Sequence, residues 1–99
     1  MSGTTVNHVV IQAEWQGIAI TIRHTPQRFA GYDHLEIVSQ DELRLPITET
    51  GYRSHFLLPE ELAEFGDPCG YVIAWLDYEG SSNEWRADVE KRAQLSLFG

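Results

Sequence analysis

The chain has one cysteine, no long apolar run and few basic residues, and each shortage excludes a class of protein. Cys69 has no partner for an internal disulfide, and a lone thiol favours a reducing compartment. No apolar run approaches the roughly 18 residues of a membrane-spanning helix, and the first residues lack the basic and apolar regions of a signal peptide. We therefore expect a cytoplasmic protein that has no membrane partner.

Basic residues are scarce relative to acidic ones. Seven lysines and arginines face 15 aspartates and glutamates, which gives a formal net charge of -8. Phosphate backbones repel such a chain, so we expect no direct binding to nucleic acid. The charge serves solubility, or it forms an acidic face that imitates DNA or meets a basic partner.

Sequence motifs of catalysis and metal binding are also missing. The chain contains no HExxH, CxxC, GxSxG, phosphate-loop or dinucleotide-binding pattern. We therefore predict a protein that is not an enzyme and has no catalytic residues, metal site or cofactor. The alternative is a small enzyme or metal protein that uses His24, His34 and His55, which requires their loops to share one end of a sheet.

The first half of the chain shows the period-two alternation of β-strands. The stretch VVIQAEWQGIAITIRH predicts a hairpin about Gln16 and Gly17, in which Ile11 faces Ile22 on the apolar side. The alternation on both sides of the turn fits only this register, because a one-residue slip would expose the apolar side chains to water.

Two further strands are predicted after the hairpin. Residues 24–33 are expected to form a loop, and HLEIVS at 34–39 a third strand. ELRLPIT at 42–48 predicts the fourth strand, and Pro46 places it at an edge because proline cannot donate to a strand ladder. The sheet then has one free edge for pairing between subunits, which leaves a homo-oligomer open.

Three helices are predicted after residue 58. The first begins at Pro59 and stops at Gly66, the second is capped by Asp67 and stops before Gly80, and the third opens with a capping box at Ser81. The order predicts an α+β fold: a four-stranded antiparallel sheet, made of the N-terminal hairpin plus two strands, covered by two or three C-terminal helices. We assign residues 1–93 to a single domain and residues 94–99 to a C-terminal linear motif.

A cluster of aromatic and basic side chains interrupts this acidic chain in the stretch LPITETGYRSHF. Tyr52, Arg53, His55 and Phe56 follow the glycine turn at Gly51. Such clusters are typical of protein recognition surfaces, and also of loops that fold their aromatic side chains beneath a helix. We retain both interpretations and treat the four residues as a second candidate surface.

The chain ends in RAQLSLFG, which is unusually apolar for a terminus. The third predicted helix carries Trp85, Val89 and Ala93 on one side, and Leu95 and Leu97 would then point to different sides of it, since residues two apart differ by about 200°. In an extended peptide the two leucines share one side. The pattern therefore favours an extended linear motif over a continued helix.

This terminal pentapeptide, Gln94, Leu95, Ser96, Leu97 and Phe98, resembles the peptide by which bacterial polymerases, mismatch-repair proteins and replication regulators bind the DNA polymerase III β sliding clamp. The resemblance implies that the glutamine is hydrogen-bonded at the clamp surface. It also implies that the leucines and the phenylalanine fill an apolar pocket of the clamp. The expected partner is therefore a protein, the bacterial sliding clamp.

The wider chain, from about residue 22 to 98, resembles small proteins carried on plasmids and other mobile elements of proteobacteria. The shared stretches are DHLEI, LPITETGYRSHF, YVIAWLD and QLSLF. This resemblance implies a setting and no mechanism. We predict a bacterial interaction protein that docks on the sliding clamp.

An antidefence inhibitor of the anti-CRISPR or antirestriction kind is the second hypothesis, with a host defence protein as its partner. If it imitates DNA, it needs a contiguous acidic surface. That surface would draw on these carboxylates: Glu60, Glu61, Glu64, Asp67, Asp77 and Glu79.

Overall fold

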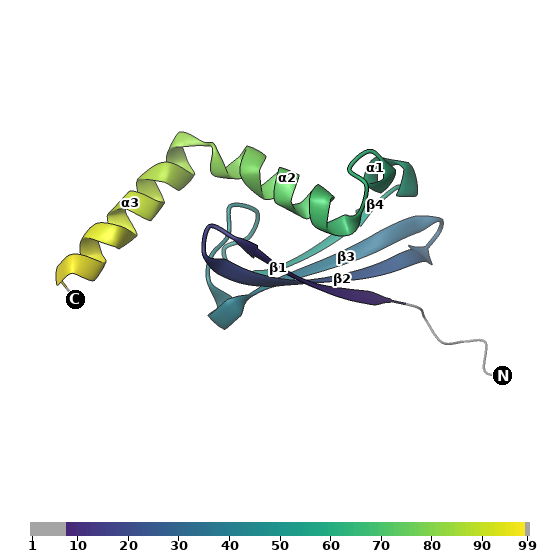
Figure 1. Cartoon of the computed structure of the whole chain (residues 1–99), viewed down its shortest axis with the longest axis horizontal. Coiled ribbons are helices and arrows are strands. Elements are labelled where there is room, and N and C mark those ends of the chain that lie inside the picture. Colours follow the sequence, from purple (N-terminus) through teal and green to yellow (C-terminus); the bar gives the residue numbers. More distant parts are fainter. Residues whose placement is uncertain (1–7, 99) are drawn as a thin grey trace.

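The protein is a four-stranded antiparallel meander with helices against one face (Figure 1). The computed structural model describes the backbone of residues 8–98 and the side chains of residues 8–94. The strands are β1 (Val9–Trp15), β2 (Ile18–Phe29), β3 (Tyr32–Ser39) and β4 (Tyr52–Leu57), and they pair in chain order. The helices α1 (Pro59–Ala63), α2 (Pro68–Gly80) and α3 (Asn83–Phe98) follow. The predicted α+β fold class is confirmed.

The first hairpin has the predicted register. Ile11 pairs with Ile22 and Trp15 pairs with Ile18, so the turn consists of Gln16 and Gly17. Both turn residues have positive φ, 49° and 80°, as a two-residue hairpin turn of the primed type requires.

The predicted loop at 24–33 is wrong, because β2 continues to Phe29 and turns at Ala30 and Gly31. The ladder between β2 and β3 shifts register between Thr25 and Phe29. Pro26 lies inside this irregular stretch, where no ladder donor is needed, so the proline does not end the strand.

The fourth strand also differs from its predicted position. Residues 42–48 form no strand; they follow a short 3-10 turn (Gln40–Glu42) and contain one isolated bridge between Leu45 and Thr48. Leu45 is buried nonetheless, with 1% of its surface exposed. The apolar alternation at 42–48 therefore identified a buried residue correctly. The segment that pairs with β3 as the fourth strand is β4.

The core lies between the sheet and α2, which Figure 1 shows crossing one face. It comprises these buried side chains: Trp15, Ile20, Ile22, Leu35, Ile37, Leu45, Ile47, Leu57, Leu62, Val72, Leu76 and Trp85. The second predicted helix is confirmed. Asp67 caps it by accepting a hydrogen bond from the Gly70 N–H at 2.7 Å, and Gly80 ends it.

Within the part of the chain that the structure describes, no helix is both long enough and apolar enough to cross a bilayer.

Candidate functional site: the projecting C-terminal helix

Helix α3 leaves the end of α2 and extends away from the sheet (Figure 1). Its N-terminus is fixed by Ser82, whose Oγ accepts a hydrogen bond from the Trp85 N–H at 3.1 Å. Ser81, the predicted start of the capping box, instead closes α2 through its hydroxyl, which donates to the Tyr78 carbonyl at 2.7 Å. The cap is therefore Ser82, and the helix starts one residue later than the sequence predicts.

An anchor of two tryptophans joins the base of α3 to the body. Trp85 has 5% of its surface exposed, and its ring lies 5.8 Å from the ring of Trp15, centroid to centroid. The Trp15 indole donates to Asp77 Oδ1 at 2.8 Å, which fixes that ring against the end of α2. The pair belongs to the core and lies where α2, α3 and the first hairpin meet.

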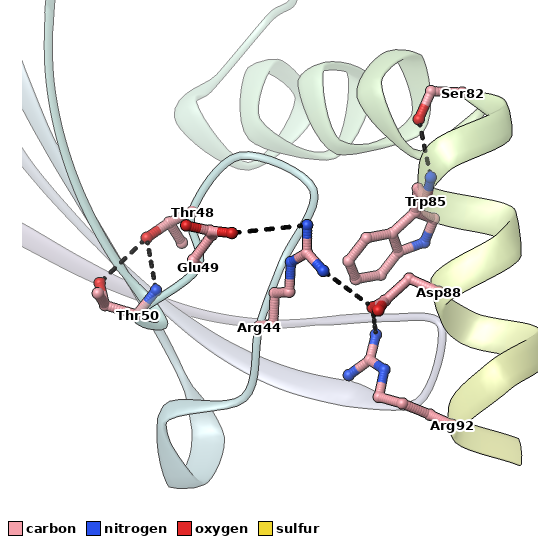
Figure 2. Close-up of polar contacts among 8 residues, drawn as sticks. All are labelled: Arg44, Thr48, Glu49, Thr50, Ser82, Trp85, Asp88 and Arg92. Atoms are coloured by element: carbon pink, nitrogen blue, oxygen red, sulfur yellow. Dashed lines mark hydrogen bonds and ion pairs between the residues drawn. The ribbon is translucent and has the colours of Figure 1, made fainter. Parts of the chain in front are cut away.

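Charged side chains complete the anchor (Figure 2). Asp88 Oδ2 lies 3.2 Å from Arg44 Nη1 and 3.0 Å from Arg92 Nη2. The guanidinium carbons of the two arginines lie 5.9 Å and 5.2 Å from the centroid of the Trp85 ring. Arg44 belongs to the connection between β3 and β4, so the network links this connection to α3. Cation–π contacts at partly exposed sites are worth about 0.5–1 kcal/mol each.

Beyond the anchor, α3 has little contact with the body. Val89 has 39% of its surface exposed, and residues 90–94 are all exposed. Propensity rather than packing sustains this part, because alanine, glutamate, lysine, arginine and glutamine favour helix. The pair Asp88–Arg92 adds support four residues apart.

The terminal pentapeptide therefore follows an exposed helical segment. Gln94 is exposed, and the backbone of residues 94–98 continues α3 as helix. The expectation of an extended peptide is wrong for this state. That expectation assumed that a helix here needs a buried face, but residues 90–94 are helical although they are exposed. The side chains of Leu95, Ser96, Leu97 and Phe98 lie outside the described part.

The second candidate surface is divided between the two faces of the sheet. Arg53 and His55 point toward α2, while Tyr52 and Phe56 lie on the uncovered face, because neighbouring residues of a strand alternate. The Tyr52 hydroxyl donates to a carboxylate oxygen of Glu36 at 2.8 Å. This hydrogen bond, and to a lesser extent burial, raises the pKa of Tyr52.

The helix side of this surface is an aromatic cluster. His55 Nε2 lies 3.2 Å from the Tyr71 hydroxyl oxygen, and its ring lies 4.6 Å from that of Trp75. Burial lowers the pKa of His55, the neighbouring Arg53 lowers it further, and the carboxylate of Glu61 opposes both. The imidazole is therefore held in its neutral form at neutral pH.

The three histidines of the metal or enzyme hypothesis do not meet. His34 lies on the uncovered face, where its Nε2 is 2.7 Å from the Ser54 hydroxyl oxygen. His24 lies on the other face, with its Nε2 2.8 Å from Asp33 Oδ2. His24 and His55 both pair with Leu35, which lies between them. Among the side chains of residues 8–94, no three histidine, cysteine or acidic groups gather as metal ligands.

The six carboxylates of the DNA-imitation hypothesis are spread over both ends of α2. Glu60, Glu61 and Glu64 belong to α1 and the residue after it, before the start of α2. Asp67 caps α2, and Asp77 accepts from the Trp15 indole, so both carboxylates serve the fold. Asp67 and Asp77 are ten residues apart, which is about 15 Å along a helix. The set does not form one continuous acidic face.

Together, the four-stranded meander, the single covering helix and the projecting helix define a small α+β domain with a helical appendage. A family model described as the KlcB third domain matches residues 8–85 of the chain. The chain therefore belongs to the KlcB third domain family. The match ends at Trp85, the residue that anchors α3, so the terminal pentapeptide lies beyond it. Searches of curated proteins and of solved structures find no match.

Proposed function

We propose that this protein is a non-enzymatic docking protein of the KlcB type, found on mobile elements, that binds the bacterial β sliding clamp through residues 94–98. One observation carries the proposal: after Trp85 the chain leaves the body, and it is exposed from Val89 to Gln94. A peptide presented in this way is accessible to a partner. Family membership is compatible with the mobile-element setting. There, such a protein would recruit the host replication machinery or interfere with it.

The helix sets the reach of the peptide. From Trp85 to Phe98 there are 13 helical steps, so the end of α3 stands about 20 Å from its anchor. The acidic body is thereby held away from the surface of the clamp. The anchor at the helix base makes this spacing part of the fold.

Docking in an extended form requires the last turn of α3 to unwind. The final turn of any helix leaves four carbonyl groups without intrahelical partners. Residues 90–94, which lead into that turn, are exposed, so packing against the body does not hold this described part of the helix. We expect a micromolar affinity, about -8 kcal/mol, for so few anchoring side chains.

The test measures the binding of the full chain to purified clamp by isothermal titration calorimetry. The variant Leu97→Ala/Phe98→Ala removes two pocket side chains and should weaken binding by at least about 30-fold, since each anchor is worth 1 kcal/mol or more. Lys91→Ala, on the same exposed helix but outside the peptide, is the matched control and should bind as the unaltered chain does. Equal binding by the double variant, or no binding by the unaltered chain, contradicts the proposal.

A second variant tests the coupling to unwinding. Ala93→Gly destabilises the end of the helix by about 1 kcal/mol without touching the pentapeptide. If the peptide binds extended, the variant should bind up to about fivefold more tightly. Weaker binding would show that the clamp takes the helical form.

A further inference from the structure

A row of aromatic side chains on α2 flanks the core and is only partly covered by it. Tyr71, Trp75 and Tyr78 follow one another at helical spacing on the flank of α2 beside Val72 and Leu76; Tyr71 and Trp75 are half-buried against the core, and Tyr78 is exposed. Tyr78 has 76% of its surface exposed, although a tyrosine ring is largely apolar. Large aromatic side chains are the commonest energetic centres of protein interfaces.

These rings form an open hollow rather than a flat stripe. It is lined by Phe65, Tyr71, Ala74, Trp75 and Tyr78. The Phe65 ring meets the Tyr71 ring edge-on at 89°, with centroids 5.2 Å apart, and Tyr71 and Trp75 are inclined by 62°. Steeply inclined rings present faces to the same space, which is the geometry that surrounds a bound cation.

The charge around the hollow favours a cationic occupant. Glu61 Oε2 accepts from the Leu58 N–H at 2.8 Å, which fixes this carboxylate at the start of α1. Burial and the charge of Glu61 both raise the pKa of Tyr71. The Glu61 carboxylate therefore acts on a ring that lines the hollow, in a chain whose formal net charge is -8.

The chain already uses one ring of this row to hold a cation. The guanidinium carbon of Arg53 lies 5.4 Å from the centroid of the Trp75 ring, and Arg53 also donates to the Ile47 carbonyl at 3.2 Å. Arg53 is not among the residues that line the hollow, so this contact does not fill it.

We propose that this hollow binds a basic segment of a partner protein, with arginine or lysine side chains held between the aromatic rings and attracted by the carboxylate of Glu61. The row runs along α2 from Tyr71 to Tyr78, seven helical steps or about 10 Å, which matches about three residues of extended peptide. The hollow does not include the pentapeptide on α3. The proposal for the hollow is therefore independent of whether the protein binds a clamp.

The test uses a short fluorescein-labelled peptide of alternating arginine and glycine, titrated with the full chain and followed by fluorescence anisotropy. The comparison peptide has citrulline in place of arginine, which keeps size and hydrogen bonding and removes the charge. We expect the arginine peptide to bind and the citrulline peptide to bind at least about tenfold more weakly. No binding of the arginine peptide, or equal binding of both, overturns the proposal.

Two substitutions that leave the net charge unchanged distinguish binding in the aromatic hollow from general electrostatic attraction to an acidic protein. Tyr78→Ala should weaken binding about two- to fivefold, the equivalent of 0.5–1 kcal/mol for one exposed cation–π contact. Phe29→Ala removes a ring of similar exposure, 71%, from the end of β2; this ring does not line the hollow, so its loss should change nothing. Equal effects of the two variants overturn the proposal.

A pair of charge variants tests the border of the hollow. Glu61→Gln keeps the acceptor for the Leu58 N–H while removing the charge, and should weaken binding more than Glu90→Gln, which removes a carboxylate from exposed α3. Equal losses would mean that the peptide responds to net charge alone and would overturn the proposal.

Discussion

Replacing Trp85 by alanine tests whether α3 is attached through its base. The side chain is 5% exposed and contacts Trp15, Arg44 and Arg92. A tryptophan buries about 150–250 Å². At about 25 cal/mol per Å² this corresponds to about 4–6 kcal/mol, which is an upper bound.

The expected loss of unfolding free energy is smaller than this bound. Trp85 lies at the edge of the core, where α3 can shift to close part of the space, so we expect about 3 kcal/mol, the lower end for such substitutions. In a chain of this size each kcal/mol corresponds to about 4–8 °C, so the melting temperature should fall by about 12–24 °C.

Val89→Ala is the control, one helical turn further along. Val89 has 39% of its surface exposed, so its loss should cost about 0.5 kcal/mol or less. Urea denaturation followed by far-ultraviolet circular dichroism measures both variants. The claim that α3 is attached to the body only at its base would be refuted by either of two results. One is a loss of unfolding free energy below about 1 kcal/mol for Trp85→Ala, and the other is a loss above about 1.5 kcal/mol for Val89→Ala.

Two further predictions concern the turn before β4 and the histidine beneath α2. A Cβ at Gly51 would lie 2.7 Å from the Glu42 backbone, whereas one at Gly17 has open space, and both glycines have positive φ, +83° and +80°. Thermal unfolding should therefore show a loss of unfolding free energy of about 1 kcal/mol for Gly17→Ala and more than about 3 kcal/mol for Gly51→Ala. Similar losses for the two variants would contradict the close approach of the Glu42 backbone to Gly51. For His55, burial, together with Arg53, lowers the pKa in the folded state, so the unfolded state takes up a proton first as pH falls through about 6.5 and stability decreases. Urea unfolding of His55→Gln should show less stability loss between about pH 7.5 and 5.5 than the unaltered chain, and an equal loss would contradict this.

The first hairpin was predictable from sequence because two local signals agree. The position of Gly17 and the apolar alternation on both sides of it permit one register, and β1 and β2 pair in that register. The second helix was predictable for the same reason, since the cap at Asp67 and the proline after it coincide with the start of the apolar stripe.

β4 could not be found by alternation because its inward positions are mostly not apolar. Arg53 and His55 face α2, and only Leu57 is a buried apolar residue of the strand. Arg53 and His55 contact aromatic residues of α2, which are distant in sequence. These contacts allow polar side chains to occupy the inward positions of β4. The same alternation separates Tyr52 from Arg53, so the second candidate surface could not be resolved into two faces before the strand was known.

The candidate sites were located from sequence to different degrees. The pentapeptide is visible in the sequence because a linear motif depends on consecutive residues. The aromatic hollow is not, because it combines Phe65 after α1 with residues of α2 that periodicity alone assigns to the core.

Residues close together in the chain were enough to predict the α+β class, the register of the first hairpin and the span of α2, and to reveal the pentapeptide. Tertiary structure decided which segment became the fourth strand, where the histidines and carboxylates lie, and how far the body supports α3. These outcomes depend on contacts between distant segments, such as Trp85 with Trp15 and Asp88 with Arg44. Such contacts leave no periodic signal in the chain.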